Sequence, residues 1–220
     1  MTQPDDLIDA LEPVVKIFHE LGIRHFIGGS IASSFHGATR STMDVDVVCD
    51  LTGAQVAPFV SRLSKDFYVS QTAVENAVRN KSGFNLIHLP TAFKVDIFIS
   101  RGRPFDDDSM RRATRESIGT IRSLEVPIAT AEDSIVSKLE CNRLTDKTSQ
   151  RQWNDVTRLV HLLGNQLDFA YLGRAADAVG VSDLLERLLY QGQVLTASCR
   201  TARPHQDDCP EVLRVTAITC

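Results

Sequence analysis

Residues 27–48 (IGGSIASSFHGATRSTMDVDVV) constrain this chain most, because they join a glycine turn to a strand that carries two acidic residues. Side chains on a strand alternate between its two faces. Asp44 and Asp46 therefore share one face, and the apolar residues beside them face a core. Two like charges about 4 Å apart repel by roughly 4 kcal/mol in a partly solvated site. We expect a cation between them, and oxygen ligands on a rigid strand favour Mg²⁺. Alternatively, Asp44 and Asp46 could simply lie on a solvated strand edge.

The front of the same stretch predicts an anion site. Gly28 and Gly29 allow the backbone to approach a ligand, because no Cβ stands in the way. We expect Ser30 to be the N-cap of a short helix over residues 31–36. Free backbone N–H groups at a helix N-terminus bind anions, above all phosphate. Ser30 could also act as a cap alone, and the two roles are compatible.

A third carboxylate is expected on a neighbouring strand. In KVDIFI, residues 94–99, Val95 and Ile97 share one face and Asp96 lies on the other. An isolated aspartate on a strand can also be an ordinary surface residue. Together with Asp44 and Asp46, Asp96 completes a predicted metal-binding set.

The order of these motifs resembles a known signature. Gly-Gly-Ser, thirteen further residues, Asp-Val-Asp and a later strand aspartate are similar to the motif set of the DNA polymerase β-like nucleotidyltransferase superfamily. Residues 40–46 (RSTMDVD) resemble the Arg-x-Thr-x-Asp-x-Asp segment of the AbiEii/AbiGii toxin-type nucleotidyltransferases. On this resemblance Arg40 and Thr42 join Gly28, Gly29 and Ser30 as nucleotide-binding residues.

The resemblance extends to the second half of the chain. The segments SIVSKL, residues 134–139, and RQWNDV, residues 151–156, look like two helical motifs of the toxin group. It implies that Lys138 lies near a triphosphate and that Asp155, on the following helix, belongs to the catalytic residues. A lysine on a helix is otherwise usually just solvated.

The function that these motifs indicate is transfer of a nucleoside monophosphate from an NTP to a hydroxyl group. Asp44, Asp46 and Asp96 would hold two Mg²⁺ ions, an arrangement that stabilises in-line displacement at phosphorus. The resemblance implies RNA, specifically tRNA 3′ ends, as acceptor, and a toxin with a cognate antitoxin protein. Two alternatives stay open: a nucleotide-binding regulatory protein that has lost the chemistry, and an enzyme that modifies a small molecule such as an antibiotic.

Composition excludes little but is consistent with such an enzyme. The 220 residues are 43% hydrophobic and 24% charged, and the formal net charge is −4, which argues against a general nucleic-acid coat protein. Five widely spaced cysteines predict free thiols in a reducing cytoplasm. No stretch predicts a membrane span or a signal peptide.

Periodicity predicts helices and strands of an α+β protein. The resemblance implies that they form a nucleotidyltransferase-type mixed sheet flanked by helices, followed by a C-terminal helical bundle. We expect a catalytic domain over residues 1–128, a helical domain over 129–192 and a poorly ordered tail over 193–220. Helices are predicted over residues 5–21, 52–63, 72–80, 104–118, from 131, 150–163, 169–179 and 182–190. Strands are predicted over residues 24–27, 44–49, 67–70, 83–89, 93–100 and 121–128.

Other polar residues have less specific interpretations. His25 and His36 are expected to be structural or surface residues, because no catalytic partner is evident for either. The arginines between residues 101 and 115 could dock an RNA backbone or form a polar helix face. Three aspartates at 106–108 weaken their field and favour the second interpretation.

Overall fold

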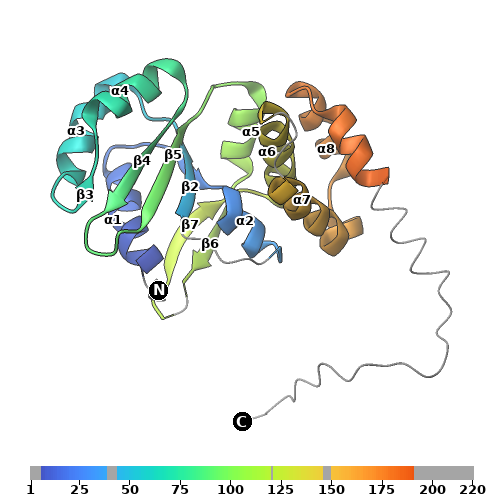
Figure 1. Ribbon diagram of the computed structural model, residues 1–220, viewed down its shortest axis with the longest axis horizontal. Coiled ribbons are helices and arrows are strands. Elements are labelled where there is room, and N and C mark those ends of the chain that lie inside the picture. Colours follow the sequence, from blue (N-terminus) through green and yellow to red (C-terminus); the bar gives the residue numbers. More distant parts are fainter. Residues whose placement is uncertain (1–5, 39–43, 120, 146–149, 191–220) are drawn as a thin grey trace, which may run out of the picture.

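The computed structural model describes residues 6–38, 44–119, 121–145 and 150–190. Helices and strands alternate through the first two thirds of the chain, and helices follow (Figure 1). The first group is α1 (Asp6–Glu20), β1 (His25–Ile27), α2 (Gly29–Phe35), β2 (Asp44–Cys49), α3 (Gly53–Leu63), β3 (Phe67–Tyr68), α4 (Gln71–Asn80), β4 (Gly83–His88), β5 (Lys94–Ile99), α5 (Pro104–Arg112), β6 (Thr114–Ile118) and β7 (Leu124–Ile128). The second group is α6 (Ala131–Leu144), α7 (Gln150–Leu163), a 3₁₀ turn (Gly164–Gln166), α8 (Phe169–Ala178) and a helical segment over residues 182–190.

The strands form one mixed sheet in the order β3-β4-β5-β2-β1-β7-β6. β2 pairs with β5 and β1 pairs with β7 in parallel, and the other neighbouring pairs are antiparallel. The predicted α+β class with a mixed sheet and a following set of helices is therefore confirmed. Parallel pairing of β2 with β5 matters for function, because it sets the two acidic strands side by side.

One face of the sheet packs on α1, α3 and α4. Val45, Val47, Val95 and Ile97 are fully buried on that face, in one apolar cluster with Phe18 of α1 and Phe59 of α3. The Phe18 and Phe59 rings stack with centroids 5.5 Å apart. The amphipathic pattern of α1 predicts this, since its apolar side carries the residues that the sheet buries.

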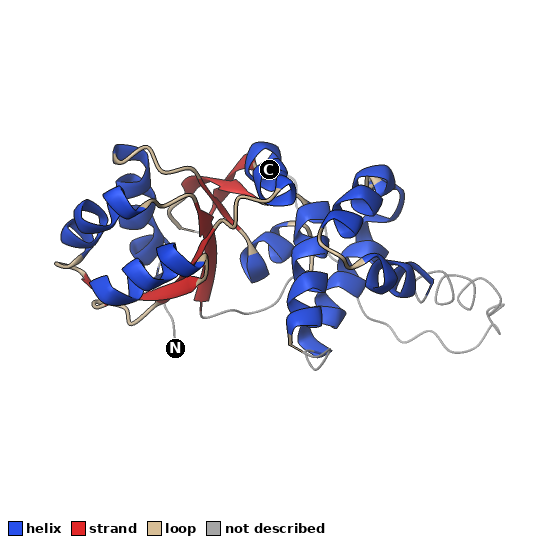
Figure 2. Cartoon of the chain, turned by 90° about the horizontal axis from the view of Figure 1, so that it is seen from above, coloured by secondary structure: helices blue, strands red, loops and turns tan. Residues whose placement is uncertain are grey.

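A second apolar cluster joins the helices that follow the sheet. Most of its members lie on α6, α7, α8 and residues 182–190, Leu167 and Val181 come from the connections between them, and Ala38 and Phe105 reach it from the sheet part. Seen from above, the sheet stands between the helices of the first part and those of the second (Figure 2). We propose the division into a catalytic domain, residues 1–128, and a helical domain, residues 129–192, on these two cores; the tail over 193–220 lies outside the described residues.

The prediction of one helix over residues 104–118 is wrong. α5 ends at Arg112, Ala113 turns the chain with φ −53° and ψ 128°, and β6 follows. β6 makes an antiparallel hairpin with β7, from Thr114 opposite Ile128 to Ile118 opposite Leu124. The hairpin satisfies backbone groups that the edge of β7 would otherwise leave unpaired, and this long-range pairing outweighs the local helical pattern.

The expected N-cap role of Ser30 is also wrong. α2 begins at Gly29, so Gly28 holds the cap position and no side chain caps the helix. Ser30 is a buried residue of the first turn instead. The helix therefore begins two residues earlier than expected, and Gly29 at its start has a φ of +56°, a conformation that favours glycine.

Candidate active site

The acidic strands meet in register. Asp46 of β2 lies opposite Asp96 of β5, and Asp44 lies opposite Lys94. Val45 and Val47 are fully buried, while the aspartates on either side of them are partly exposed on the other face. The predicted sharing of one face by Asp44, Asp46 and Asp96 follows from this alternation and register, and we call these three side chains the carboxylate face.

Gly29 holds the glycine turn against the carboxylate face. Its φ is +56°, and a Cβ built there would lie 1.6 Å from Oδ2 of Asp46. The backbone N–H of Ser30 donates a hydrogen bond to the Asp46 carboxylate, and the N–H of Gly28 donates to the Asp46 carbonyl over 2.9 Å. The Gly-Gly-Ser motif and the Asp-x-Asp motif are thus one structural unit, in which only glycine fits at position 29.

The Asp46 carboxyl is crowded by like charge. Burial raises its pKa to about 6, and the negative charges of Asp44 and Asp96 act in the same direction. The positive charge of Lys138 and the N–H of Ser30 lower the pKa but do not cancel this effect. Such a carboxyl favours a neighbour of positive charge.

Lys94 supplies positive charge that the sequence interpretation missed. Its ammonium lies 2.7 Å from Asp96 Oδ2 and 4.0 Å from Asp44 Oδ2. The hydrogen bond to Asp96 raises the pKa of Lys94. Lys94 precedes Asp96 by two residues on a strand, so alternation alone placed both on the same face and could have revealed it.

Lys138 and Asp155 form a buried ion pair beside this site. Nζ of Lys138, on α6, lies 2.8 Å from Asp155 Oδ2, on α7, and 3.3 Å from Gln152 Oε1. Their side chains are 6% and 7% exposed. The Lys138 charge acts on the Asp46 carboxyl, and α6 packs against α2, the helix that begins at the glycine turn. The structure therefore brings Lys138 and Asp155 together, on the side of the helical part that meets the carboxylate face.

The carboxylate oxygens of Asp44, Asp46 and Asp96 are ligands that suit Mg²⁺, although they do not form a preassembled metal site. Among residues 6–38, 44–119, 121–145 and 150–190, no three His, Cys, Asp or Glu side chains are placed so that they could hold a metal ion. The three carboxylates are nevertheless hard oxygen ligands on two strands in register, and two of them, Asp44 and Asp96, already pair with the Lys94 ammonium. The chemistry of these three side chains therefore fits a divalent cation.

The remaining sequence candidates have structural roles or lie outside the described residues. Arg40 and Thr42 fall within the undescribed residues 39–43. His36 Nε2 lies 2.8 Å from the Ala129 carbonyl, and buried His25 packs against Phe18 with its Nδ1 3.1 Å from the Ile23 carbonyl. Both histidines are structural, as expected.

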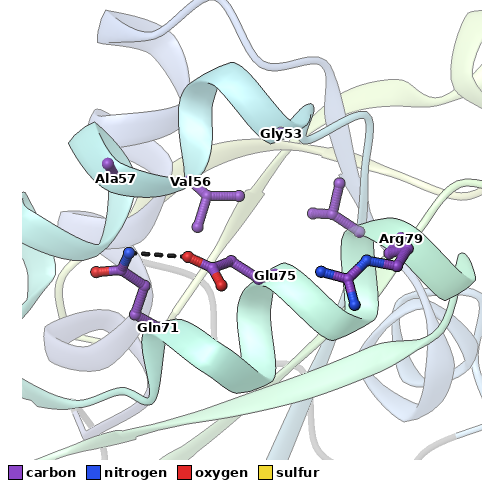
Figure 3. Close-up of a pocket in the computed structure, with 7 residues that line it drawn as sticks. Gly53, Val56, Ala57, Gln71, Glu75 and Arg79 are labelled. Carbon is purple, nitrogen blue, oxygen red and sulfur yellow. Dashed lines mark hydrogen bonds between the residues drawn. The ribbon is translucent and has the colours of Figure 1, made fainter.

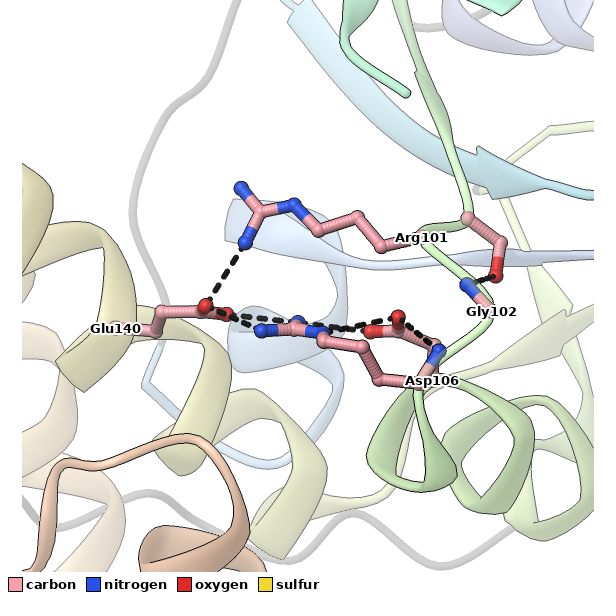
Figure 4. Close-up of polar contacts among 6 residues, drawn as sticks. Arg101, Gly102, Asp106 and Glu140 are labelled. Atoms are coloured by element: carbon pink, nitrogen blue, oxygen red, sulfur yellow. Dashed lines mark hydrogen bonds and ion pairs between the residues drawn. The ribbon is translucent and has the colours of Figure 1, made fainter. Parts of the chain in front are cut away.

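Several arginines that could have docked RNA are engaged elsewhere. Figure 4 shows Arg101 directed at Glu140 of α6. Arg103 pairs with both Glu140 and Asp106. Arg103 approaches Glu140 at 2.6 Å and Asp106 at 2.9 Å, so the connection after β5 is joined to the helical part by charge. The interpretation of these two arginines as an RNA surface is therefore disfavoured.

An open groove between α3 and α4 does not belong to the site. It has a volume of about 360 Å³ and is lined by Gly53, Val56, Ala57, Gln71, Glu75, Val78 and Arg79. Figure 3 shows the hydrogen bond between Gln71 and Glu75, both on α4. α3 and α4 cover the face of the sheet opposite the carboxylates, so the groove and the carboxylate face are separated by the sheet.

Comparison with known proteins supports the fold. No protein-family model matches the sequence, and no curated protein matches it. A nucleotidyltransferase-like antigenic protein from Paracoccidioides brasiliensis matches in structure with a TM-score of 0.55 and 16% identity, over 90% of this chain and 92% of that one. The antibiotic-resistance factor ANT(2″)-Ia in solution matches with a TM-score of 0.50 and 14% identity, over 90% and 100%.

The same resistance factor, in complex with adenylyl-2″-tobramycin, matches with a TM-score of 0.51 and 12% identity, over 79% of this chain and 96% of that one. At these identities the likenesses show a common fold. This chain therefore has the nucleotidyltransferase fold, as the sequence motifs indicated, and the particular closeness to the AbiEii/AbiGii group stays a prediction.

Proposed function

We propose that this protein is a Mg²⁺-dependent nucleotidyltransferase that moves a nucleoside monophosphate from an NTP to a hydroxyl group. The observation that carries the proposal is the register of β2 and β5, which aligns Asp46 with Asp96 beside the glycine turn. Three carboxylates on one face repel one another, and a purely structural strand pair gains nothing from that arrangement. A nucleotidyltransferase fold provides the reason for it.

Each candidate residue has a role in this reaction. Asp44 and Asp46 would hold the cation that contacts the triphosphate, and Asp96 with them would hold a second. In the proposed reaction the acceptor oxygen forms a bond to the α-phosphorus, the bond to pyrophosphate breaks, and Asp96 would take the acceptor proton. Bound Mg²⁺ would neutralise charge on the attacking and leaving oxygens.

The glycine turn and the helical part complete the nucleotide site in this proposal. Gly28, Gly29 and Ser30 would approach the triphosphate, and the resemblance assigns Arg40 and Thr42 to the same task. Lys138 would neutralise triphosphate charge, with Asp155 orienting its ammonium through the 2.8 Å contact. Because the pair is nearly free of solvent, a lysine held in this way loses little flexibility when it binds.

An acceptor with flat rings, such as RNA, is supported by the open part of the sheet. Across β3, β4, β5 and β2, Tyr68 lies opposite Ile87, Ile87 opposite Lys94, and Lys94 opposite Asp44. Tyr68 is 63% exposed, and Phe98, two residues beyond Asp96, is 44% exposed. Exposed aromatic rings beside a reactive centre can stack on unpaired bases. The tRNA 3′ end, the toxin role and a cognate antitoxin rest on the resemblance alone.

A cationic antibiotic is the second candidate acceptor, and a structural likeness favours it. ANT(2″)-Ia is an antibiotic-resistance factor that was solved with adenylyl-2″-tobramycin. The net charge of −4 and the carboxylate face would both attract a polyamine sugar. A protein that binds NTP without turnover is the third possibility, and the like-charged carboxylates argue against it.

Incubation of the protein with Mg²⁺, each α-³²P-labelled NTP, and either total RNA or a panel of aminoglycosides tests the proposal. We expect label on RNA from at least one NTP. Label on an aminoglycoside and none on RNA would identify an antibiotic, rather than RNA, as the acceptor. NTP binding by calorimetry without label on any acceptor would support the silent binder and overturn the proposal.

Phe98→Ala, compared with Phe169→Ala, tests the acceptor surface. Both phenylalanines are 44% exposed, but Phe169 lies on α8, away from the sheet. We expect Phe98→Ala to lower kcat/KM for RNA by roughly tenfold, since base stacking contributes about 1–3 kcal/mol per base. Equal effects of the two substitutions would exclude stacking on Phe98.

The proposed location is the cytoplasm, where NTP and RNA are both present. None of the helices in the described ranges is long and apolar enough to cross a membrane.

A further inference from the structure

The ion pairs of Lys94 suggest a role for this residue that neither the motifs nor the comparisons assign. Lys94 begins β5, directly opposite Asp44 in the parallel register. Its ammonium contacts Asp96 Oδ2 at 2.7 Å and approaches Asp44 Oδ2 at 4.0 Å. The side chain is therefore shared between two of the three residues of the carboxylate face.

The Lys94 ammonium lies where a metal ion shared by Asp44 and Asp96 would bind. Mg²⁺ binds carboxylate oxygens at about 2.1 Å, so an ion shared by Asp44 and Asp96 would lie between their oxygens. The Lys94 ammonium already lies in that region. Two positive groups cannot both occupy it, because like charges in a partly buried site repel strongly. Binding of a divalent cation there requires the ammonium to leave.

The side chain of Lys94 is able to leave. It is 40% exposed, on a face of the sheet where its register neighbour Ile87 is also exposed. Lysine carries its charge on a flexible four-carbon stem, so the ammonium can move into solvent without displacing the strand. Lys138 differs in this respect, because its ammonium is held in a buried pair with Asp155.

We propose that Lys94 is a resident counter-ion of the carboxylate face, which a divalent cation displaces when it binds. Lys94 holds the like-charged carboxylates together in the metal-free protein and weakens their affinity for free metal. It is a positioning residue, because it acts through Asp44 and Asp96. This inference rests on the proposed function for the identity of the metal site, and it adds a competitor that the proposed function does not require.

Mn²⁺ binding without nucleotide, measured from the EPR signal of free Mn²⁺, tests the inference directly. Mn²⁺ accepts the same oxygen ligands as Mg²⁺. We expect Lys94→Met to bind Mn²⁺ about tenfold more tightly than the wild type, since a like-charged neighbour is removed. Lys94→Arg keeps the charge and should bind as the wild type does. Lys65→Met, a change of the same charge at an exposed site, should also have no effect.

The outcomes separate this inference from the proposed function. Equal or weaker binding in Lys94→Met, with binding lost in Asp46→Ala, would overturn the role of Lys94 and leave the metal site intact. Equal binding in wild type and Asp46→Ala would show that the metal does not use the carboxylate face, and would overturn both.

A second measurement uses the unaltered protein, so that it does not depend on the folding of a variant. Trace labelling with acetic anhydride, read by peptide mass spectrometry, reports how free each lysine is. Mn²⁺ should increase the labelling of Lys94 severalfold and leave Lys65 unchanged. Labelling of Lys94 that stays constant or falls on addition of Mn²⁺ would contradict displacement.

Discussion

Charge is balanced at the Lys138–Asp155 pair and in excess at the carboxylate face. The pair lies between α6 and α7 with side chains 6% and 7% exposed, one positive group matched to one negative. On β2 and β5, the carboxylates of Asp44, Asp46 and Asp96 share one face with the Lys94 ammonium, and Asp44 and Lys94 are 39% and 40% exposed. The first arrangement is suited to holding a fixed charge in place, and the second to exchanging one cation for another.

The largest expected effect concerns activity at the face with excess charge. Asp46→Asn and Asp96→Asn should each lower transfer by about a thousandfold or more, because two-metal catalysis depends on both ligands. Asp66→Asn, an exposed aspartate outside the face, is the matched control and should keep full activity. Transfer rates with labelled NTP decide this, and near-normal activity in Asp96→Asn would remove that residue from the site.

The balanced pair should show its largest effect in stability. Lys138→Ala removes the ammonium that faces the buried Asp155 carboxylate, which costs about 3 kcal/mol in unfolding free energy. The double variant Lys138→Met/Asp155→Leu should regain most of that loss, since apolar residues can replace a buried pair, but transfer should stay low. Denaturant titration and the labelled-NTP assay measure the two effects. A double variant with normal activity would make the pair purely structural.

Removing one negative charge from the carboxylate face should stabilise the protein, whereas Lys138→Ala destabilises it. The raised pKa of Asp46, about 6 against an ordinary value near 4, means that its ionised form destabilises the metal-free fold. That cost is absent below about pH 4, grows as the pH rises to about 6, and is complete above it. Asp46→Asn removes the cost, so it should stabilise the metal-free protein by about 2 kcal/mol at pH 8.

Unfolding of Asp46→Asn and wild type at pH 8 and pH 4, in the presence of a chelator, provides the check. The gain should disappear at pH 4, where the wild-type carboxyl is protonated. A variant that is less stable than the wild type at pH 8 would show that the Asp46 carboxylate stabilises the fold.

The smallest expected effect lies at the charged junction of the two parts. Arg103 contacts both Asp106 and Glu140 and is 31% exposed, so Arg103→Ala should cost about 1 kcal/mol. Arg122 pairs with Asp9 and Glu12 at a more exposed site, and Arg122→Ala should cost less than half of that. Thermal unfolding compares them, and a larger loss in Arg122→Ala would reverse the ranking.

The local sequence pattern was sufficient to predict the carboxylate face. Alternation of apolar and acidic residues predicted that Asp44 and Asp46 share a face and that Asp96 lies on another strand, and the glycine turn could be predicted beside them. The close contact of Gly29 with Asp46 could not be predicted from the sequence, because it depends on how β1 and β2 are paired. Lys94 was overlooked although the same alternation placed it beside Asp96.

Long-range pairing explains the remaining differences. Residues 104–118 were predicted as one helix, yet residues 114–118 form β6, which pairs with β7 in the sheet. The contact between Lys138 and Asp155 spans 17 residues across two helices, and no spacing rule predicts it. Only the resemblance pointed to these two residues together. Arg40 and Thr42 stay predictions.

The most direct test of the central claim is a crystal structure with Mn²⁺ and a non-hydrolysable NTP analogue, with metal positions located by anomalous scattering. We predict an anomalous peak bound by Asp44 and Asp46 next to the triphosphate, with Asp96 at the same cluster and the Lys94 ammonium turned away. An anomalous peak elsewhere in the molecule, or a triphosphate bound away from the glycine turn, would contradict it.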